Sequence, residues 1–72
     1  MLIGKIDMRS RQKILVTIRD VKNIKMIDVR VHNTDDDGEM IATPAGISLS
    51  EAQVDKAIEL LTEAKLKVGA QK

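Results

Sequence analysis

A chain of 72 residues that contains no aromatic residue and no cysteine has few means of building a stable core by itself. A domain of this length buries only about 60% of the surface that its unfolded chain exposes, so disulfides, a metal or a partner subunit often complete it. Disulfides are excluded because there is no cysteine, and the large aromatic side chains that usually fill a small core are missing. The composition therefore favours one small domain, residues 1–72, completed by oligomerisation.

The charged residues are segregated along the chain, although the formal net charge is only +1. Residues 1–30 hold eight Lys or Arg against three Asp, whereas residues 31–50 hold four acidic residues and no Lys or Arg. These charges either solvate the faces of strands or form an anion-binding surface in the first part of the chain. No apolar run approaches the roughly 18 residues that span a bilayer, and the N-terminus is too short for a secretory signal, so we expect a cytoplasmic protein with no membrane partner.

Alternating apolar residues predict a short antiparallel sheet. Ile14, Val16 and Ile18 share one face of a strand over 13–19, and Ile27, Val29 and Val31 share one face of a strand that starts at Lys25. The short connection between them predicts a hairpin whose second strand turns Met26, Asp28 and Arg30 to the other side. Two further strands are predicted at 3–8 and 39–43.

A C-terminal helix is predicted after the sheet, which Pro44 and Gly46 are expected to end. Ser50 and Gln53 have the spacing of a capping box, and apolar residues then recur every three or four positions up to Gly69, a plausible stop. The helix is expected to be about 17 residues long. The predicted fold is α+β, a four-stranded antiparallel sheet followed by one C-terminal helix.

The apolar residues exceed what one small sheet and one helix need. The surplus suggests a homodimer, although a helix lying across its own sheet with a few exposed leucines is the simpler alternative. The residues expected at the dimer interface are Val54, Ile58, Leu61, Leu15 and Met26.

Several kinds of site are disfavoured. The stretch from Asn33 to Gly38 matches the opening half of an EF-hand loop, but its twelfth position is Pro44, so turn chemistry explains it better. His32 is the only histidine, which leaves no zinc site and no Cys–His pair. With no glycine-rich phosphate loop and little room for a pocket, we expect no enzyme, metal, cofactor or small-molecule substrate.

The cations of the hairpin are the remaining candidates for a site. Arg19, Lys22, Lys25 and Arg30 lie on two strands and their turn, where they can follow a phosphate backbone. In the structural alternative, Arg19 and Arg30 pair with Asp28 or Asp20, and the lysines only protect an edge strand.

Five segments together resemble the positive cofactor four family of transcriptional coactivators, over about residues 3 to 63. They are Ile3-Gly4-Lys5, Arg19-Asp20-Val21-Lys22, Ile27-Asp28-Val29-Arg30, Asp37-Gly38-Glu39-Met40 and Gly46-Ile47-Ser48-Leu49, followed by Glu51-Ala52-Gln53. The resemblance implies a homodimer that binds single-stranded or unpaired DNA on its sheet, without sequence preference and without catalysis.

The resemblance places DNA contacts on Arg19, Lys22 and Arg30, with Lys25 replacing a turn lysine that is Ile24 here, and Arg9, Arg11 and Lys13 enlarging the patch. Other contacts of the family are replaced. Its phenylalanine is Val21, its stacking tryptophan is Asn33, and its basic residues near the fourth strand are Ile41, Pro44 and Ala45. Because stacking contributes roughly 1–3 kcal/mol per base, binding should be weaker and should depend mainly on phosphates.

The family's long regulatory arm is not seen in this sequence. In this respect the chain resembles a prokaryotic or phage relative, which we expect at the nucleoid or in the cytoplasm of a phage host. The expected roles are transcription regulation, replication or recombination. An alternative function is a protein-interaction module whose DNA surface has decayed and whose acidic segment Asp35 to Glu39 docks a polymerase or recombination protein. RNA binding through the same cations is a third possibility.

Overall fold

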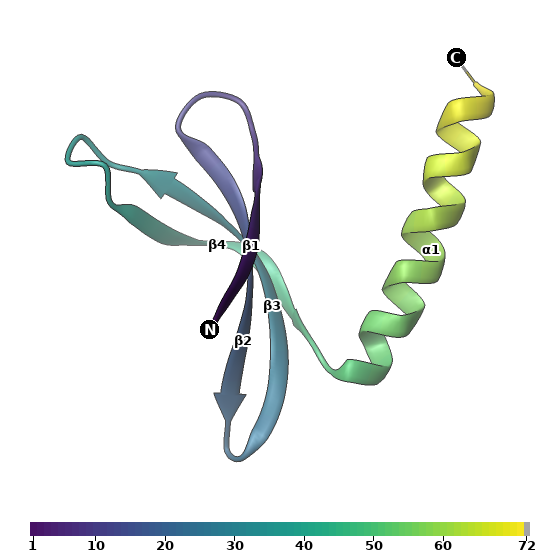
Figure 1. The fold of residues 1–72 in the computed structure, drawn as a ribbon, viewed down its shortest axis with the longest axis horizontal. Helices are drawn as coiled ribbons and strands as arrows, with labels where there is room; N and C mark the ends of the chain where they lie inside the picture. Colours follow the sequence, from purple (N-terminus) through teal and green to yellow (C-terminus); the bar gives the residue numbers. More distant parts are fainter. Residues whose placement is uncertain (72) are drawn as a thin grey trace.

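The computed structural model describes residues 1–71 and contains four strands and one helix. The strands are β1 (Leu2–Asp7), β2 (Gln12–Val21), β3 (Ile24–Thr34) and β4 (Met40–Leu49), and the helix is α1 (Glu51–Ala70). The strands form one antiparallel sheet in the order β1-β2-β3-β4 (Figure 1). The predicted fold and the hairpin of the second and third strands are confirmed.

The β2–β3 hairpin closes through a two-residue turn. Lys22 and Asn23 have positive φ angles of 51° and 66°, as in the tight turns whose twist matches that of the flanking strands. Val21 therefore pairs with Ile24, and the register continues residue by residue to Gln12 opposite Asn33. This register decides which side chains share a face, because directly paired residues of antiparallel strands lie on the same side.

The prediction that Pro44 and Gly46 end the sheet is wrong, because β4 runs through both. The register shifts here: Arg30 pairs with Gly46 while His32 pairs with Ala42, so β4 bulges outward around Pro44. A proline without an N–H is tolerated at a bulge on an edge strand. The side chain of Thr43 replaces the missing ladder bond, because its Oγ1 donates to the carbonyl of Val31 at 2.8 Å.

Helix α1 begins as predicted and ends slightly later. The Ser50 side chain accepts from the backbone N–H of Gln53, and the Gln53 side chain accepts from the backbone N–H of Ser50, which completes the capping box. The helix has 20 residues rather than about 17. Gly69 does not stop it, because this glycine does not take a positive φ, and the cap is Gln71. No helix within residues 1–71 is long and apolar enough to cross a membrane.

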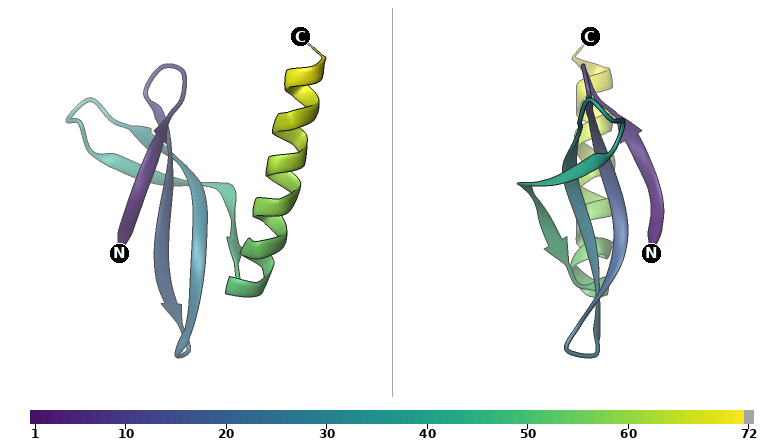
Figure 2. Two further views of the ribbon diagram at one scale, coloured as in Figure 1. Left: turned by 45° about the vertical axis from the view of Figure 1, so that its right-hand side comes forward. Right: turned by 90° about the vertical axis from the view of Figure 1, so that its left-hand side faces the viewer.

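The single chain has almost no core. Within residues 1–71, Leu15 is the only buried apolar residue, at 7% exposure, and helix α1 contains no buried residue. The helix extends beside the sheet and is partly covered only near its start, at Val54 and Ala57 (Figures 1 and 2). The Cα radius of gyration is 14.3 Å, against about 11 Å for a closely packed chain of this length. The sheet therefore leaves most of the apolar stripe of the helix uncovered; the stripe consists of Val54, Ala57, Ile58, Leu61, Ala64 and Val68.

Candidate nucleic-acid interface

The sheet has an apolar face and a charged face. Register and alternation place Ile14, Val16 and Ile18 of β2 with Val31, Val29 and Ile27 of β3 on the apolar face. The same register puts a different set on the opposite side, which we call the charged face: Lys5, Lys13, Leu15, Thr17, Arg19, Met26, Asp28, Arg30, His32 and Ser48. Arg19 and Arg30, predicted to act together, thus lie on one surface.

Asp28 lies at the centre of the charged face, in the middle of strand β3. Arg30 donates to it twice, from Nε to Oδ2 and from Nη2 to Oδ1, both at 3.1 Å. Ser48 donates from Oγ to Oδ1 at 2.8 Å, and the Nη1 of Arg19 lies 3.9 Å from the same oxygen. The structural alternative, in which Asp28 pairs with both arginines, is therefore observed.

These contacts shift the ionisation of the pair. The two hydrogen bonds from Arg30 lower the pKa of Asp28 below its ordinary value, although burial opposes this shift. The same hydrogen bonds raise the pKa of Arg30. Both side chains are therefore charged at neutral pH, and the carboxylate remains an acceptor for the guanidinium.

Acid is expected to remove the contribution of Asp28 to stability. The folded chain binds fewer protons than the unfolded chain at this site, because the pKa of Asp28 lies below the ordinary 3.8. The contribution is therefore complete above that value and is lost as the pH falls through the lower folded-state pKa. This contribution is measured by urea unfolding of the wild type and Asp28→Asn at several pH values from about 7 to about 3. The difference in stability should shrink toward the acid end, and a constant difference would contradict a role for the charge.

Arg30 is held at both ends of its guanidinium. Besides the fork on Asp28, Nη1 donates to the carbonyl of Thr43 at 3.0 Å, and the side chain is only 21% exposed. Of the five N–H donors of an arginine, three are used. One donor is left on each terminal nitrogen, and such a pair can take two oxygens of a phosphate.

Lys25 does not belong to the charged face. It pairs with Asp20 and shares a side with Ile18 and Ile27, so it lies on the apolar face, and its Nζ is 2.8 Å from Asp20 Oδ1. There it lines a hollow of about 270 Å³ together with Met1, Ile18, Ile27 and Glu51. The prediction that Lys25 shares a surface with Arg19 and Arg30 is wrong, because the register places it on the opposite face of the sheet.

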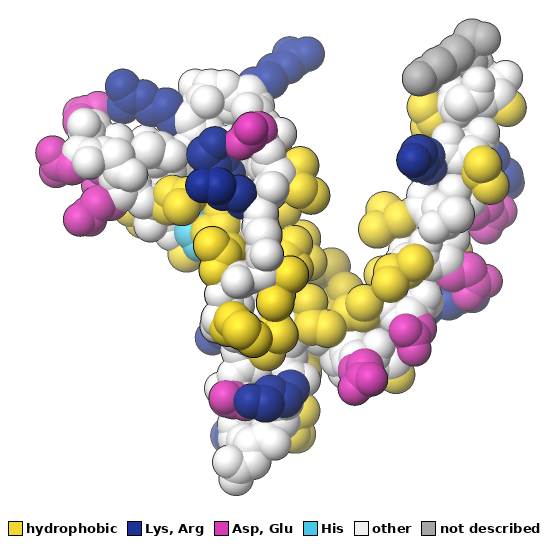
Figure 3. Space-filling view, viewed as in Figure 1, with side chains coloured by type: hydrophobic (Ala, Val, Ile, Leu, Met, Phe, Trp, Pro, Cys, Tyr) yellow, Lys and Arg dark blue, Asp and Glu magenta, His cyan; other side chains and the backbone are white. Residues whose placement is uncertain are grey.

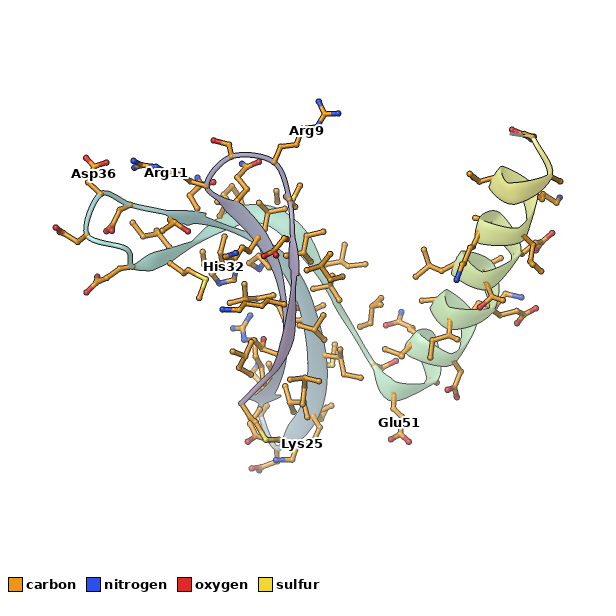
Figure 4. The ribbon with its side chains drawn as sticks, turned by 45° about the horizontal axis from the view of Figure 1, so that its top comes forward. Arg9, Arg11, Lys25, His32, Asp36 and Glu51 are labelled. Carbon is orange, nitrogen blue, oxygen red and sulfur yellow. The ribbon has the colours of Figure 1, made fainter. Side chains whose placement is uncertain are left out.

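Three more cations of the predicted set lie at the end of the sheet away from the β2–β3 turn: Arg9, Arg11 and Lys13. Lys13 lies on the charged face and pairs with Asp7 at 2.5 Å, which lowers the pKa of that carboxyl. The Nη1 of Arg11 lies 2.6 Å from the Oδ1 of Asp36 in the β3–β4 turn. Arg9 extends away from the sheet at the β1–β2 turn (Figure 4). Within residues 1–71, Arg9 and Lys22 are the members of the predicted set without an ion pair.

The hairpin end of the charged face offers exposed apolar side chains for contact with bases. Val21 and Ile24 pair there, beside Lys22, and both are exposed. Met26 follows on the same side and is partly buried. Leu15 also faces this side but is covered by its own chain. The exposed aliphatic pair therefore stands where the family resemblance implies an aromatic side chain.

The acidic segment forms a turn by its own hydrogen bonds. The Oδ1 of Asp35 accepts from the backbone N–H groups of Asp37 and Glu39, each at 2.9 Å. Gly38 supplies the positive φ, 83°, that the turn requires. These contacts agree with the turn interpretation of the sequence. His32 is a strand residue whose Nδ1 lies 3.1 Å from the Arg30 carbonyl oxygen.

Sequence reasoning missed two partners of the central pair: Thr43, which binds Arg30, and Ser48, which binds Asp28. Both come from β4, whose course around Pro44 was not predicted. The signal for the central pair was present, because Asp28 and Arg30 are two residues apart on one strand and must share a face. Its burial depends on neighbours from other strands, so one strand alone does not reveal it.

Comparisons with known proteins agree with this geometry. The family model of the transcriptional coactivator p15 (PC4) matches residues 8–60. Two crystal structures of a PC4 homologue from Burkholderia pseudomallei K96243 are similar to this chain at 26% sequence identity. The orthorhombic form has a TM-score of 0.86, covering 90% of this chain and 88% of the other; the tetragonal form has 0.84, covering 90% and 96%. No curated protein sequence matches significantly.

Proposed function

Since the chain belongs to the transcriptional coactivator p15 (PC4) family, we propose that it binds single-stranded or unpaired DNA through the charged face of its sheet, as a homodimer. The observation that carries the proposal is the placement of Arg19 and Arg30 on one face around Asp28. Lys22 extends this surface at the hairpin turn. No base-edge reader is needed for this function, since phosphates carry no sequence information.

Phosphate contacts supply most of the affinity in this proposal. Arg19, Lys22 and Arg30 follow the hairpin from its turn to the middle of the sheet, as an electrostatic track for one strand. Val21 and Ile24 offer a small apolar contact for a base. Without aromatic stacking, the strand is held mainly by charge.

The homodimer is supported by the surface that one chain leaves uncovered. Its accessible surface is 5992 Å², whereas a folded monomer of 8.0 kDa exposes about 4,450 Å². The excess of roughly 1,500 Å² lies within the range that each chain of an obligate dimer buries. Figure 3 shows hydrophobic side chains along the side of α1 turned toward the sheet. A second copy that covers the stripe with Ile58 and Leu61 would remove this excess.

The predicted interface residues differ in how well they fit this role. Ile58 and Leu61 are exposed on the helix, and Val54 is partly covered by the sheet. Leu15 is buried within its own chain, and Met26 lies on the charged face. Leu15 and Met26 therefore offer little to a second copy, and the helix carries the interface that we propose.

Fluorescence anisotropy tests the proposed function with a dye-labelled single strand of about 20 nucleotides, its duplex, and a duplex with an unpaired bubble. We expect tighter binding to the single strand and the bubble than to the duplex. Three phosphate contacts predict a slope of about −2 for log affinity against log salt concentration. No binding at low salt would refute the proposal and favour the protein-interaction alternative, and equal binding of a matched RNA strand would extend the ligand to RNA.

Two lysines three residues apart provide a matched pair for this experiment. Lys22→Asn removes a charge from the hairpin turn and keeps a residue that tolerates positive φ. It should weaken binding and make the slope less steep by about 0.7. Lys25→Gln removes a charge from the opposite face and should leave the slope unchanged. The reverse result would place DNA on the apolar face.

A further inference from the structure

Asp28 is the only buried charged side chain within residues 1–71, at 4% exposure. Strands β2, β3 and β4 each send a side chain to its carboxylate. Arg30 and Ser48 donate hydrogen bonds, and Arg19 forms an ion pair at 3.9 Å. Its neighbours on the charged face are more exposed, as are the carboxylates that pair with Lys13, Arg11 and Lys25. This carboxylate therefore differs from the surface ion pairs around it.

Stability alone does not account for a buried carboxylate at this position. Removing a charge pair from water costs free energy that its attraction only partly repays, and apolar residues of similar volume often stabilise a protein equally well. The carboxylate also fixes the orientation of a neighbouring side chain. The fork on Asp28 and the bond to Thr43 restrict the guanidinium of Arg30 to one orientation, in which one donor on each terminal nitrogen is unused.

We propose that Asp28 is the positioning residue of the DNA-binding face, holding Arg30, and more loosely Arg19, in the orientation that receives a phosphodiester. This inference rests on the proposed function and deepens it. An unrestrained arginine loses side-chain entropy when it binds a phosphate. Arg30 has lost that freedom before DNA arrives, so the phosphate contact forms at a smaller entropic cost.

A simple screening role would give the opposite result. If Asp28 only cancelled positive charge, its neutralisation would strengthen binding and steepen the salt dependence. The contacts of Arg30 argue for positioning. When Asn replaces the carboxylate, one of the two acceptor oxygens becomes an amide donor, so either Nε or Nη2 loses its acceptor in a largely covered site. The guanidinium must then move to regain water and leaves the site of the phosphate contact.

Anisotropy with the labelled single strand tests the proposal in a double-mutant cycle of Asp28→Asn and Arg30→Met. Asp28→Asn should weaken binding about tenfold, the usual scale of one charged hydrogen bond, and make the salt slope less steep by about 0.7. In the Arg30→Met background, the same change should have less than about a threefold effect, because Asp28 acts mainly through Arg30. Equal effects in both backgrounds, or tighter binding by Asp28→Asn, would overturn the proposal.

Two further variants separate positioning from folding. Ser48→Ala removes the neutral hydroxyl from the same carboxylate and should change affinity less than about twofold. Arg30→Lys keeps the charge but cannot form the fork, so it should lose as much affinity as Arg30→Met. If Asp28→Asn does not sediment and unfold like the wild type, the DNA affinity of Arg30→Lys tests the positioning role instead. Wild-type affinity of Arg30→Lys would refute positioning, whereas failure of the wild type to bind would refute the proposed function itself.

Discussion

Leu61→Asp is expected to abolish the dimer and to unfold most of the chain at micromolar concentration. Leu61 lies in the middle of the apolar stripe of α1 and is 70% exposed in the single chain, so the proposed second copy is what covers it. A carboxylate placed in that interface has no partner and must stay in water, which prevents the association. Because Leu15 is the only apolar residue buried within the described part of one chain, the separated chain has little to hold it together. Sedimentation velocity and far-ultraviolet circular dichroism measure both losses.

Leu66→Asp is the matched control for this prediction. Leu66 is 71% exposed, almost the same as Leu61, and lies on the same helix. Five residues correspond to about 140° around an α-helix, so Leu66 points away from the stripe. This variant should sediment and unfold like the wild type. A folded dimer of Leu61→Asp, or equal damage from Leu66→Asp, would show that the stripe is not the interface.

The elements that the sequence predicted well are those that local patterns determine. Alternation over Ile14 to Ile18 identified β2, and the pair Ser50 and Gln53 located the start of the helix to the residue. Both depend on neighbours within a few positions. The course of β4 does not, because a proline and a glycine usually mark the end of a strand. Here the partner strand accommodates both, through the bulge opposite Val31 and the close approach of Gly46 to Arg30.

The site could be predicted from the sequence where the alternation of side chains along a strand is enough to assign a residue to one face of the sheet. Arg19 and Arg30 were expected to act together, and the register brings both to Asp28. Lys25 could have been placed correctly, because it is two residues before Ile27 and must share its face. The burial of Asp28 could not be read from β3 alone. It results from Ser48 across the sheet and from Arg19 on the other neighbouring strand, so it depends on a register that only the folded chain reveals.

Gly46→Ala is expected to destabilise the protein by about 3 kcal/mol, at the upper end of what overpacking usually costs. A methyl group at this position would lie 2.6 Å from the carbonyl oxygen of Val29 and 2.7 Å from the Cα of Arg30. Both atoms belong to the backbone of β3, so they cannot move aside without opening the ladder between β3 and β4. The same methyl would lie 2.9 Å from the Cβ of Arg30, whose side chain would shift as well. Thermal unfolding at a fixed protein concentration should show a midpoint lower by on the order of 15 °C.

Gly69→Ala should stabilise the protein, in contrast to Gly46→Ala, and is the control for replacing a glycine by alanine. A methyl group there meets no atom within 4 Å, and the residue lies in the last turn of α1. Alanine is favoured over glycine in a helix, so this variant should gain about 0.5 kcal/mol. If Gly46→Ala were as stable as the wild type, β4 would have to lie farther from β3 than the structure places it. The bond that Arg30 donates to the Thr43 carbonyl and the bond that Ser48 donates to Asp28 depend on that close approach. The same result would therefore remove the basis for the arrangement of the charged face.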